Sequence, residues 1–203
     1  MQRPCHGLFA VATRLNGRHV GARALPPLIL MTDPSRLPDP EAASARLPPG
    51  SGVILRAYRD PERTRLAEAL AELARRHHLR LLIANDAALA QRVGAAGVHL
   101  SEVELGRAPF IRREHDGLIT GAAHSLAALE VAARAGIDAA LLSPVFATAS
   151  HPERVPLGLH GFAALALRAR LPVYALGGIT ARNAPRLLAT RAIGIAGIGA
   201  LSA

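Results

Sequence analysis

The chain contains no lysine and no tryptophan, and its 203 residues include a single cysteine. Without lysine, a mechanism that passes through a Schiff base on the protein is excluded. Cys5 has no partner for an internal disulfide, so we expect a cytoplasmic protein in a reducing compartment. No apolar run approaches the roughly 20 residues that span a bilayer, and an arginine interrupts the apolar opening. We therefore expect neither a membrane segment nor a signal peptide.

Aromatic residues are also scarce, with four phenylalanines and two tyrosines. Half of the residues are nevertheless hydrophobic, so the core must consist of alanine, valine, isoleucine and leucine. This composition is typical of buried parallel strands that are covered by helices. The length of the chain favours one domain over two.

The charge is strongly one-sided: 24 basic side chains, all of them arginine, outweigh 15 acidic ones and give a net charge of +9. The arginines are scattered, with no dense basic run and no interleaved aromatic residues, so we expect no nucleic-acid partner. A positive surface would instead steer a small phosphorylated substrate toward the protein.

Short apolar runs alternate with amphipathic helical stretches, which is the pattern of repeated βα units. We predict eight strands, at residues 28–32, 52–55, 79–84, 97–100, 118–122, 139–143, 173–176 and 194–198. The pattern indicates an α/β fold with a single (β/α)8 TIM-type barrel over residues 25–203. Residues 1–24 are expected to form an N-terminal arm or an extra helix.

Helix signals follow several of these strands. Asp60 is the predicted N-cap of the helix after the second strand, with Pro61 at its first position, and Ser125 is the predicted cap after the fifth strand. Only residues 199–203 follow the eighth strand, so the last helix is reduced or missing. Because an uncovered strand would expose apolar surface, we expect either a homodimer or an N-terminal segment packed across this strand.

In parallel barrels the reactive residues lie where strands end and loops begin. The polar residues at these positions are Thr32, Asp33, Arg56, Tyr58, Asn85, Asp86, His99, Glu104, His124, Thr148, Ser150 and His151. After the last two strands the pattern changes to glycine, which lets backbone N–H groups approach an anion closely. We therefore predict a phosphate site at the two glycine turns that include Gly177, Gly178 and Gly199, with Gly158 as a further phosphate-binding candidate.

Seven motifs occur in the order and spacing of one known family: LILMTDP, LRAYRDP, LLIAND, GVHLSE, SPVFATASHP, YALGGIT and GIAGIGA. From about residue 28 to residue 200 the chain resembles the thiamine phosphate synthase and thiazole tautomerase family. Members of this family either join a pyrimidine pyrophosphate to a thiazole phosphate, with release of pyrophosphate, or isomerise the thiazole phosphate ring.

The resemblance implies roles for individual residues. Arg56 matches an arginine that grips pyrophosphate, and Asn85 and Asp86 match a pair whose aspartate helps to hold Mg2+. Glu104 stands where the family has a second magnesium aspartate. Thr148 matches a threonine that contacts substrate, and Ser150 replaces a second one. Gly178, Ile198 and Gly199 match the backbone loops that hold the thiazole phosphate.

The chain also departs from the family pattern. Two family lysines are replaced, one by Tyr58 and one by His151, and a family serine at the end of the fifth strand is Ala122. Each lost cation can remove on the order of 3 kcal/mol of stabilisation from a departing pyrophosphate. Arg59 or Arg154 is a candidate to restore one charge from a neighbouring position.

The histidine that the tautomerase branch uses for proton transfer is replaced here by Pro144, as it is in the synthase branch. His124 and His151 lie in the right neighbourhood to substitute for it, because imidazole exchanges protons near neutral pH. A purely structural hydrogen bond is the alternative for His124.

We predict a transferase like thiamine phosphate synthase, with Arg56, Tyr58, His124 and His151 as catalytic candidates and Mg2+ as cofactor. Its partners are expected to be small phosphorylated heterocyclic substrates. Two alternatives stay open: an isomerase that acts on the thiazole phosphate, and a catalytically silent barrel that binds a phosphorylated ligand or a protein partner.

Overall fold

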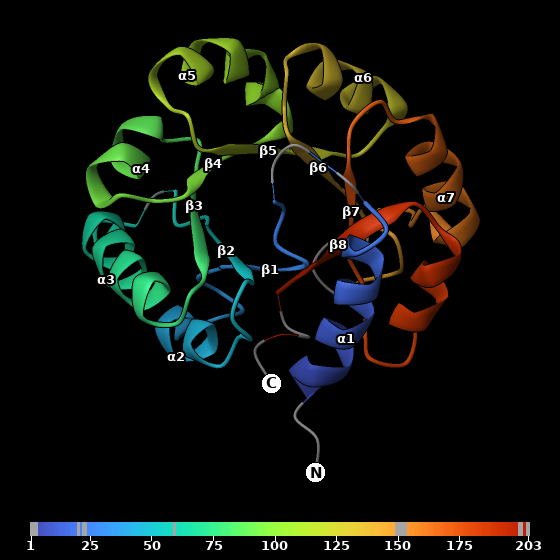
Figure 1. The fold of residues 1–203 in the computed structure, drawn as a ribbon, viewed down its shortest axis with the longest axis horizontal. Helices are drawn as coiled ribbons and strands as arrows, with labels where there is room; N and C mark the ends of the chain where they lie inside the picture. The colour runs from blue at the N-terminus through green and yellow to red at the C-terminus, as the bar shows by residue number, and fades with distance from the viewer. Residues whose placement is uncertain are drawn as a thin grey trace.

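The structure is a computed structural model, and it describes residues 4–19, 21, 24–58, 60–148, 154–198 and 201. Eight parallel strands follow one another around a closed barrel, in which β8 also pairs with β1 (Figure 1). The strands are β1 (Leu28–Met31), β2 (Gly52–Leu55), β3 (Arg80–Ala84), β4 (Gly97–Leu100), β5 (Leu118–Ala123), β6 (Ala139–Leu142), β7 (Val173–Leu176) and β8 (Ala192–Gly197). This arrangement confirms the predicted (β/α)8 fold.

Helices surround the barrel and connect its strands (Figure 1). They are α1 (Pro4–Asn16), α2 (Pro40–Ala45), α3 (Arg63–Arg76), α4 (Ala87–Val93), α5 (Ala108–Glu114), α6 (Leu126–Arg134) and α7 (Gly158–Arg168), with the 3-10 helices η1 (Glu102–Arg107) and η2 (Ala184–Ala189). Within the described ranges, none of these helices has the length and apolarity needed to cross a membrane.

Two helix starts were predicted from capping residues, with different outcomes. The Ser125 hydroxyl accepts a hydrogen bond from the amide of Ala128 and caps α6, which confirms that prediction. Asp60 is not the N-cap of α3, because its carboxylate instead accepts from the amide of Glu62 in the turn before the helix. The helix therefore begins two residues later than Pro61 suggested.

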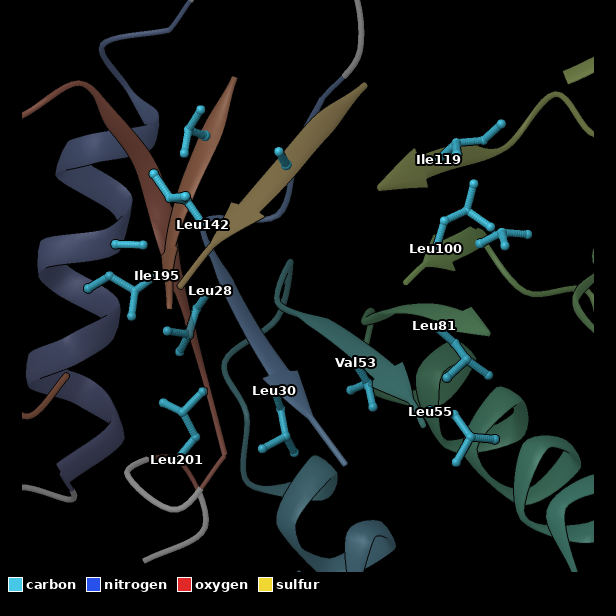
Figure 2. Close-up of a cluster of buried hydrophobic side chains, with 14 of the residues drawn as sticks. Leu28, Leu30, Val53, Leu55, Leu81, Leu100, Ile119, Leu142, Ile195 and Leu201 are labelled. Atoms are coloured by element: carbon cyan, nitrogen blue, oxygen red, sulfur yellow. The ribbon is translucent and has the colours of Figure 1, made fainter. Parts of the chain in front are cut away.

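The alternation of side chains along each strand divides the hydrophobic core into two layers. On β1, Leu28 and Leu30 belong to a cluster between the barrel and its helices (Figure 2). Ile29 and Met31 belong to a second cluster, which fills the inside of the barrel. Both faces of the strands are thus apolar, as the continuous apolar runs in the sequence predicted.

The interior cluster includes one large aromatic side chain, Tyr174, which is completely buried. Its hydroxyl donates a hydrogen bond to the carbonyl of Pro26 at 2.6 Å. The ring lies against Gly194, where an added Cβ would come within 2.7 Å of the tyrosine Cε1. Glycine is therefore needed on β8 to make room for the tyrosine of β7.

The N-terminal helix α1 packs alongside β8 and η2, in the part of the outer ring where an eighth helix would otherwise lie (Figure 1). Leu8, Ala12 and Leu15 bury one face of α1 in the outer hydrophobic cluster. The side-chain amide of Asn16 donates to the carbonyls of Leu25 and Ile193 and ties the end of the helix to the barrel. Apolar surface of β8 is thus covered from within the chain.

Candidate active site

A cavity of about 700 Å³ opens at the carboxyl ends of the strands, where a barrel of this kind carries its active site. The described lining residues are Met31, Arg36, Arg56, Tyr58, His99, Ser101, Glu102, Ala122, His124, Ser143, Pro144, Ala147, Thr148, Arg154, Leu176, Gly177, Gly178, Ile179, Thr180, Ala196, Gly197 and Ile198. Three arginines and one carboxylate are among them, so the described wall carries excess positive charge.

His99 is a buried histidine in the cavity wall, projecting from β4. Its Nδ1 lies 2.9 Å from the hydroxyl of Thr120 on the neighbouring strand β5. Burial, and to a smaller degree the charge of Arg56, lower the pKa of His99 to about 3. The ring is therefore neutral near pH 7 and presents a polar but uncharged group to a ligand.

The arginine side of the cavity is organised by Asp33, which follows β1. Its Oδ2 accepts from Arg56 at 2.9 Å and from Arg36 at 2.6 Å. The Nε of Arg56 also donates to the carbonyl of Thr32 at 2.9 Å. Partial burial favours a higher pKa for Asp33, but the hydrogen bonds from Arg36 and Ser35 and the charges of both arginines hold that pKa well below its usual range.

Tyr58 stands at the rim beyond β2, 46% exposed, with the guanidinium of Arg63 5.9 Å from the centre of its ring. Partial burial raises the pKa of its phenol, against the opposing charges of Arg56 and Arg63. The phenol is thus a neutral hydrogen-bonding group near pH 7.

His124 and Glu102 form a pair in the cavity wall. The Nδ1 of His124, beyond β5, lies 2.6 Å from Oε2 of Glu102, the first residue of η1. Each side chain is a little over one-third exposed, so the pair is reachable from the cavity. A carboxylate on one ring nitrogen orients the imidazole and favours the tautomer with its proton on Nδ1.

Glycines after β7 form another part of the wall. Gly177 has φ +98° and Gly178 has φ +64°, in the left-handed region that favours glycine. A Cβ on Gly177 would lie 2.9 Å from the Cα of Pro144, and a Cβ on Gly178 would overlap the carbonyl oxygen of Ala147. The chain is therefore tightly packed at this turn, and only backbone can face the cavity there.

A family model described as "Thiamine monophosphate synthase" matches residues 28–201. The chain belongs to this family. A "Thiamine-phosphate synthase" from Herpetosiphon aurantiacus is 36% identical over 174 residues, which cover 81% of this chain and 81% of the relative. One from a Synechococcus species is 34% identical and covers 87% of this chain but 52% of the relative, so the chain spans about half the length of that protein.

The solved structure of "Thiamine phosphate pyrophosphorylase from Pyrococcus furiosus" superimposes with a TM-score of 0.74 at 25% identity, covering 87% of each chain. Family membership and fold thus agree with the resemblance that the motifs carried.

The structure brings several of the predicted site residues into the cavity lining. They are Arg56, Tyr58, His124, Thr148, Gly177, Gly178 and Ile198. The predictions for Ser150, His151 and Gly199, and for Arg59 as a substitute cation, lie outside the described residues.

Asn85 and Gly158 are not in the described lining. The Asn85 amide donates to the hydroxyl of Ser101 and its carbonyl accepts from the Ser101 amide, so it joins the loops after β3 and β4. Gly158 begins α7 with φ +66°, and its amide donates to the carbonyl of Val145. Both residues support the loops around the cavity.

The two predicted magnesium carboxylates also lie outside the described lining. Asp86 caps α4 by accepting from the amide of Leu89 at 2.9 Å, and Glu104 pairs with Arg107 at 2.9 Å on the surface of η1. Among the described residues, no three His, Cys, Asp or Glu side chains converge as a metal site. The metal role of these two carboxylates therefore stays a prediction.

Arg36 and Glu102 line the cavity but were not predicted as site residues. Arg36 lies three residues after Asp33 in the loop that follows β1, and nothing in that loop pattern marks it as facing the cavity. Glu102 lies two residues before Glu104, so the short turn of η1, rather than the type of residue, decides which of the two carboxylates faces inward.

Proposed function

We propose that this chain is a transferase that joins a hydroxymethylpyrimidine pyrophosphate to a thiazole phosphate and releases pyrophosphate. The observation that carries the proposal is that the cavity wall, in a member of this family, has an arginine region and a separate glycine region. Arginines follow β1 and β2, and glycines follow β7, with β8 between the two regions in the order of strands. One anionic group can therefore bind at each region.

Arg56 is the proposed ligand of the departing pyrophosphate. When the bond between the pyrimidine methylene carbon and the diphosphate oxygen breaks, the electron pair leaves with the oxygen, and a fixed guanidinium stabilises the charge that develops. The lone pair of the thiazole nitrogen then forms the new carbon–nitrogen bond. Backbone amides around Gly178 and Ile198 are proposed to hold the thiazole phosphate, because glycine lets an anion approach them closely.

Neutral groups complete the proposed pocket. His99 and Thr148 line the cavity, and their side chains are proposed to bind the heterocycles without adding charge. Tyr58 replaces a family lysine by a neutral phenol, so it can donate a hydrogen bond to pyrophosphate but cannot neutralise it. Magnesium, a cytoplasmic location and the absence of a nucleic-acid partner stay proposals that rest on the family resemblance and the composition. A homodimer also stays a proposal, but an uncovered β8 no longer supports it, because α1 packs against that strand.

The experiment adds lysine back at the two substituted positions. Pyrophosphate release from the pyrimidine substrate is measured, in the presence of thiazole phosphate, for the wild type and for Tyr58→Lys combined with His151→Lys. The proposal expects release to be faster in the double variant, because two positive charges are returned to the leaving group. If the wild type is inactive and the double variant binds both substrates but is equally inactive, the transferase proposal is contradicted.

The pair of His124 and Glu102 supports a second candidate, an isomerase that moves a proton on the thiazole phosphate. An imidazole held by a carboxylate at 2.6 Å is arranged to accept and return a proton through its other nitrogen. Solvent-deuterium exchange into thiazole phosphate, followed by mass spectrometry, tests this directly. The isomerase expects exchange that is lost in His124→Gln, and the transferase expects no exchange that depends on His124.

A further inference from the structure

Two arginines in the wall of the cavity share one carboxylate oxygen, that of Asp33. The Nη2 atoms of Arg36 and Arg56 lie 2.6 Å and 2.9 Å from the same Oδ2 of Asp33. The three side chains are 32%, 23% and 17% exposed, respectively, so all are partly withdrawn from water. Both guanidinium groups line the cavity, at a place where solvent screens their charges weakly.

The cluster is held from several directions. The other oxygen of Asp33 accepts hydrogen bonds from the amide and the hydroxyl of Ser35 and from the amide of Arg36. Arg56 is fixed a second time by its Nε, which donates to the carbonyl of Thr32. Guanidinium groups that are already oriented lose little freedom when an anion binds, so more of the interaction appears as affinity.

We propose that Arg36 is a second anion-binding residue beside Arg56, with Asp33 as the residue that positions both, and that together they bind a diphosphate group. The inference rests on the proposed function and extends it to Arg36, which lies outside the family motifs, and to Asp33, which lies within the first of them. In a chain without lysine, the loop after β1 thereby supplies a cation to the leaving-group side of the cavity.

A diphosphate fits this cluster better than a single phosphate does. Each guanidinium presents several N–H donors in a planar fork, and a phosphoryl group accepts two of them in parallel. Two such forks on one carboxylate match two linked phosphoryl groups. The one carboxylate in the described lining, Glu102, pairs with His124.

The test is titration calorimetry of the purified full chain with inorganic pyrophosphate and, separately, with inorganic orthophosphate. The variants are Arg36→Gln, Arg56→Gln and Arg36→Lys. The matched control is Arg134→Gln, which removes one positive charge from an exposed position in the last turn of α6. It therefore corrects for the change in net charge.

We expect Arg36→Gln and Arg56→Gln each to weaken pyrophosphate binding by about ten-fold or more, and Arg134→Gln to change it by less than about two-fold. Arg36→Lys should recover only part of the loss, because an ammonium cannot donate two parallel hydrogen bonds. Orthophosphate should bind more weakly than pyrophosphate and depend less on Arg36.

Asp33→Asn separates positioning from simple electrostatics. The substitution raises the positive charge of the wall, so a purely electrostatic role predicts tighter pyrophosphate binding. A positioning role predicts weaker binding, because the two guanidinium groups lose their common acceptor. Tighter binding in Asp33→Asn overturns the role assigned to Asp33, and the Arg36 variants test the site even if this variant does not fold.

Three results overturn the proposed site: pyrophosphate binding in Arg36→Gln that equals that of the wild type, no binding to the wild type, or equal affinity for orthophosphate. Synthase turnover, measured on the same proteins, keeps the two proposals apart. If product forms but Arg36 is not needed for pyrophosphate binding, the inference is wrong and the proposed function stands. If pyrophosphate binds through Arg36 but no product forms, the inference stands and the proposed function is contradicted.

Discussion

The buried histidine in the wall of the cavity should make the stability of the protein depend on pH. In the folded chain the pKa of His99 is about 3, because of burial and the charge of Arg56, whereas an ordinary histidine has a pKa of 6.5. Between these two values the unfolded chain binds a proton that the folded chain does not. The free energy of unfolding therefore falls as the pH is lowered below about 6.5.

The size of this effect at pH 5 does not depend on the exact folded pKa, provided that it lies well below 5. Each pH unit below the unfolded pKa removes about 1.4 kcal/mol, so lowering the pH from 7 to 5 should remove about 2 kcal/mol through His99 alone. His99→Gln should lose about 2 kcal/mol less than the wild type over this interval, since the amide does not titrate and can still hydrogen-bond to Thr120. His77→Gln, at an exposed position after α3, is the matched control and should behave as the wild type does.

Urea unfolding followed by far-ultraviolet circular dichroism is the suitable assay, because the chain has no tryptophan to report unfolding by fluorescence. Equal losses of stability in the wild type and His99→Gln between pH 7 and pH 5 would refute the reasoning. If the variant does not fold, the imidazole carbon shifts of His99 in the wild type give the same information by NMR. Titration of that ring near pH 6.5 in the folded protein contradicts a neutral, buried histidine.

Three further predictions follow from particular residues. Gly178→Ala should weaken thiazole phosphate binding at least about ten-fold in calorimetry, because the added Cβ overlaps a backbone oxygen at positive φ. Gly106→Ala is the control and should bind as the wild type does, because no atom lies near its added Cβ. Unchanged affinity in Gly178→Ala removes this part of the site. Asp86→Ala should lower the free energy of unfolding by about 1 kcal/mol, and Asp86→Asn by much less because asparagine also caps helices. If Asp86 also holds magnesium, Asp86→Asn should nevertheless lose magnesium-dependent turnover, and a full rate in that variant excludes the metal role. Leu15→Ala should cost about 2–5 kcal/mol in urea unfolding, and a loss below about 0.5 kcal/mol is incompatible with α1 packing in the core.

The barrel could be predicted because its signal is local and repeated. The strand predicted at residues 28–32 is β1 (Leu28–Met31), and that predicted at residues 52–55 is β2 (Gly52–Leu55). Buried parallel strands need apolar residues on both faces, so each strand appears in the sequence as a short continuous apolar run. The order of these runs then leaves few topologies other than a closed barrel.

The cavity could be predicted only in part, because contacts between side chains from distant positions leave no local pattern. Arg36 and Arg56 meet at Asp33 only because β1 and β2 are neighbours in the barrel. Asp86 and Glu104 were assigned to a metal from motif position, whereas the cap on α4 and the pairing with Arg107 depend on the geometry of each turn. Residue type at a strand end thus predicts that a side chain is near the site, but not which group it contacts.

The most direct test of the proposed function is whether the purified chain joins the two heterocycles. Hydroxymethylpyrimidine pyrophosphate and thiazole phosphate are incubated with the protein, and the joined product and free pyrophosphate are quantified together by mass spectrometry and a coupled assay. A transferase should form equal amounts of both and require both substrates, and its rate should fall at least about 100-fold in Arg56→Gln but not in Arg134→Gln. Absence of the joined product from wild-type protein that binds both substrates would contradict the proposed function.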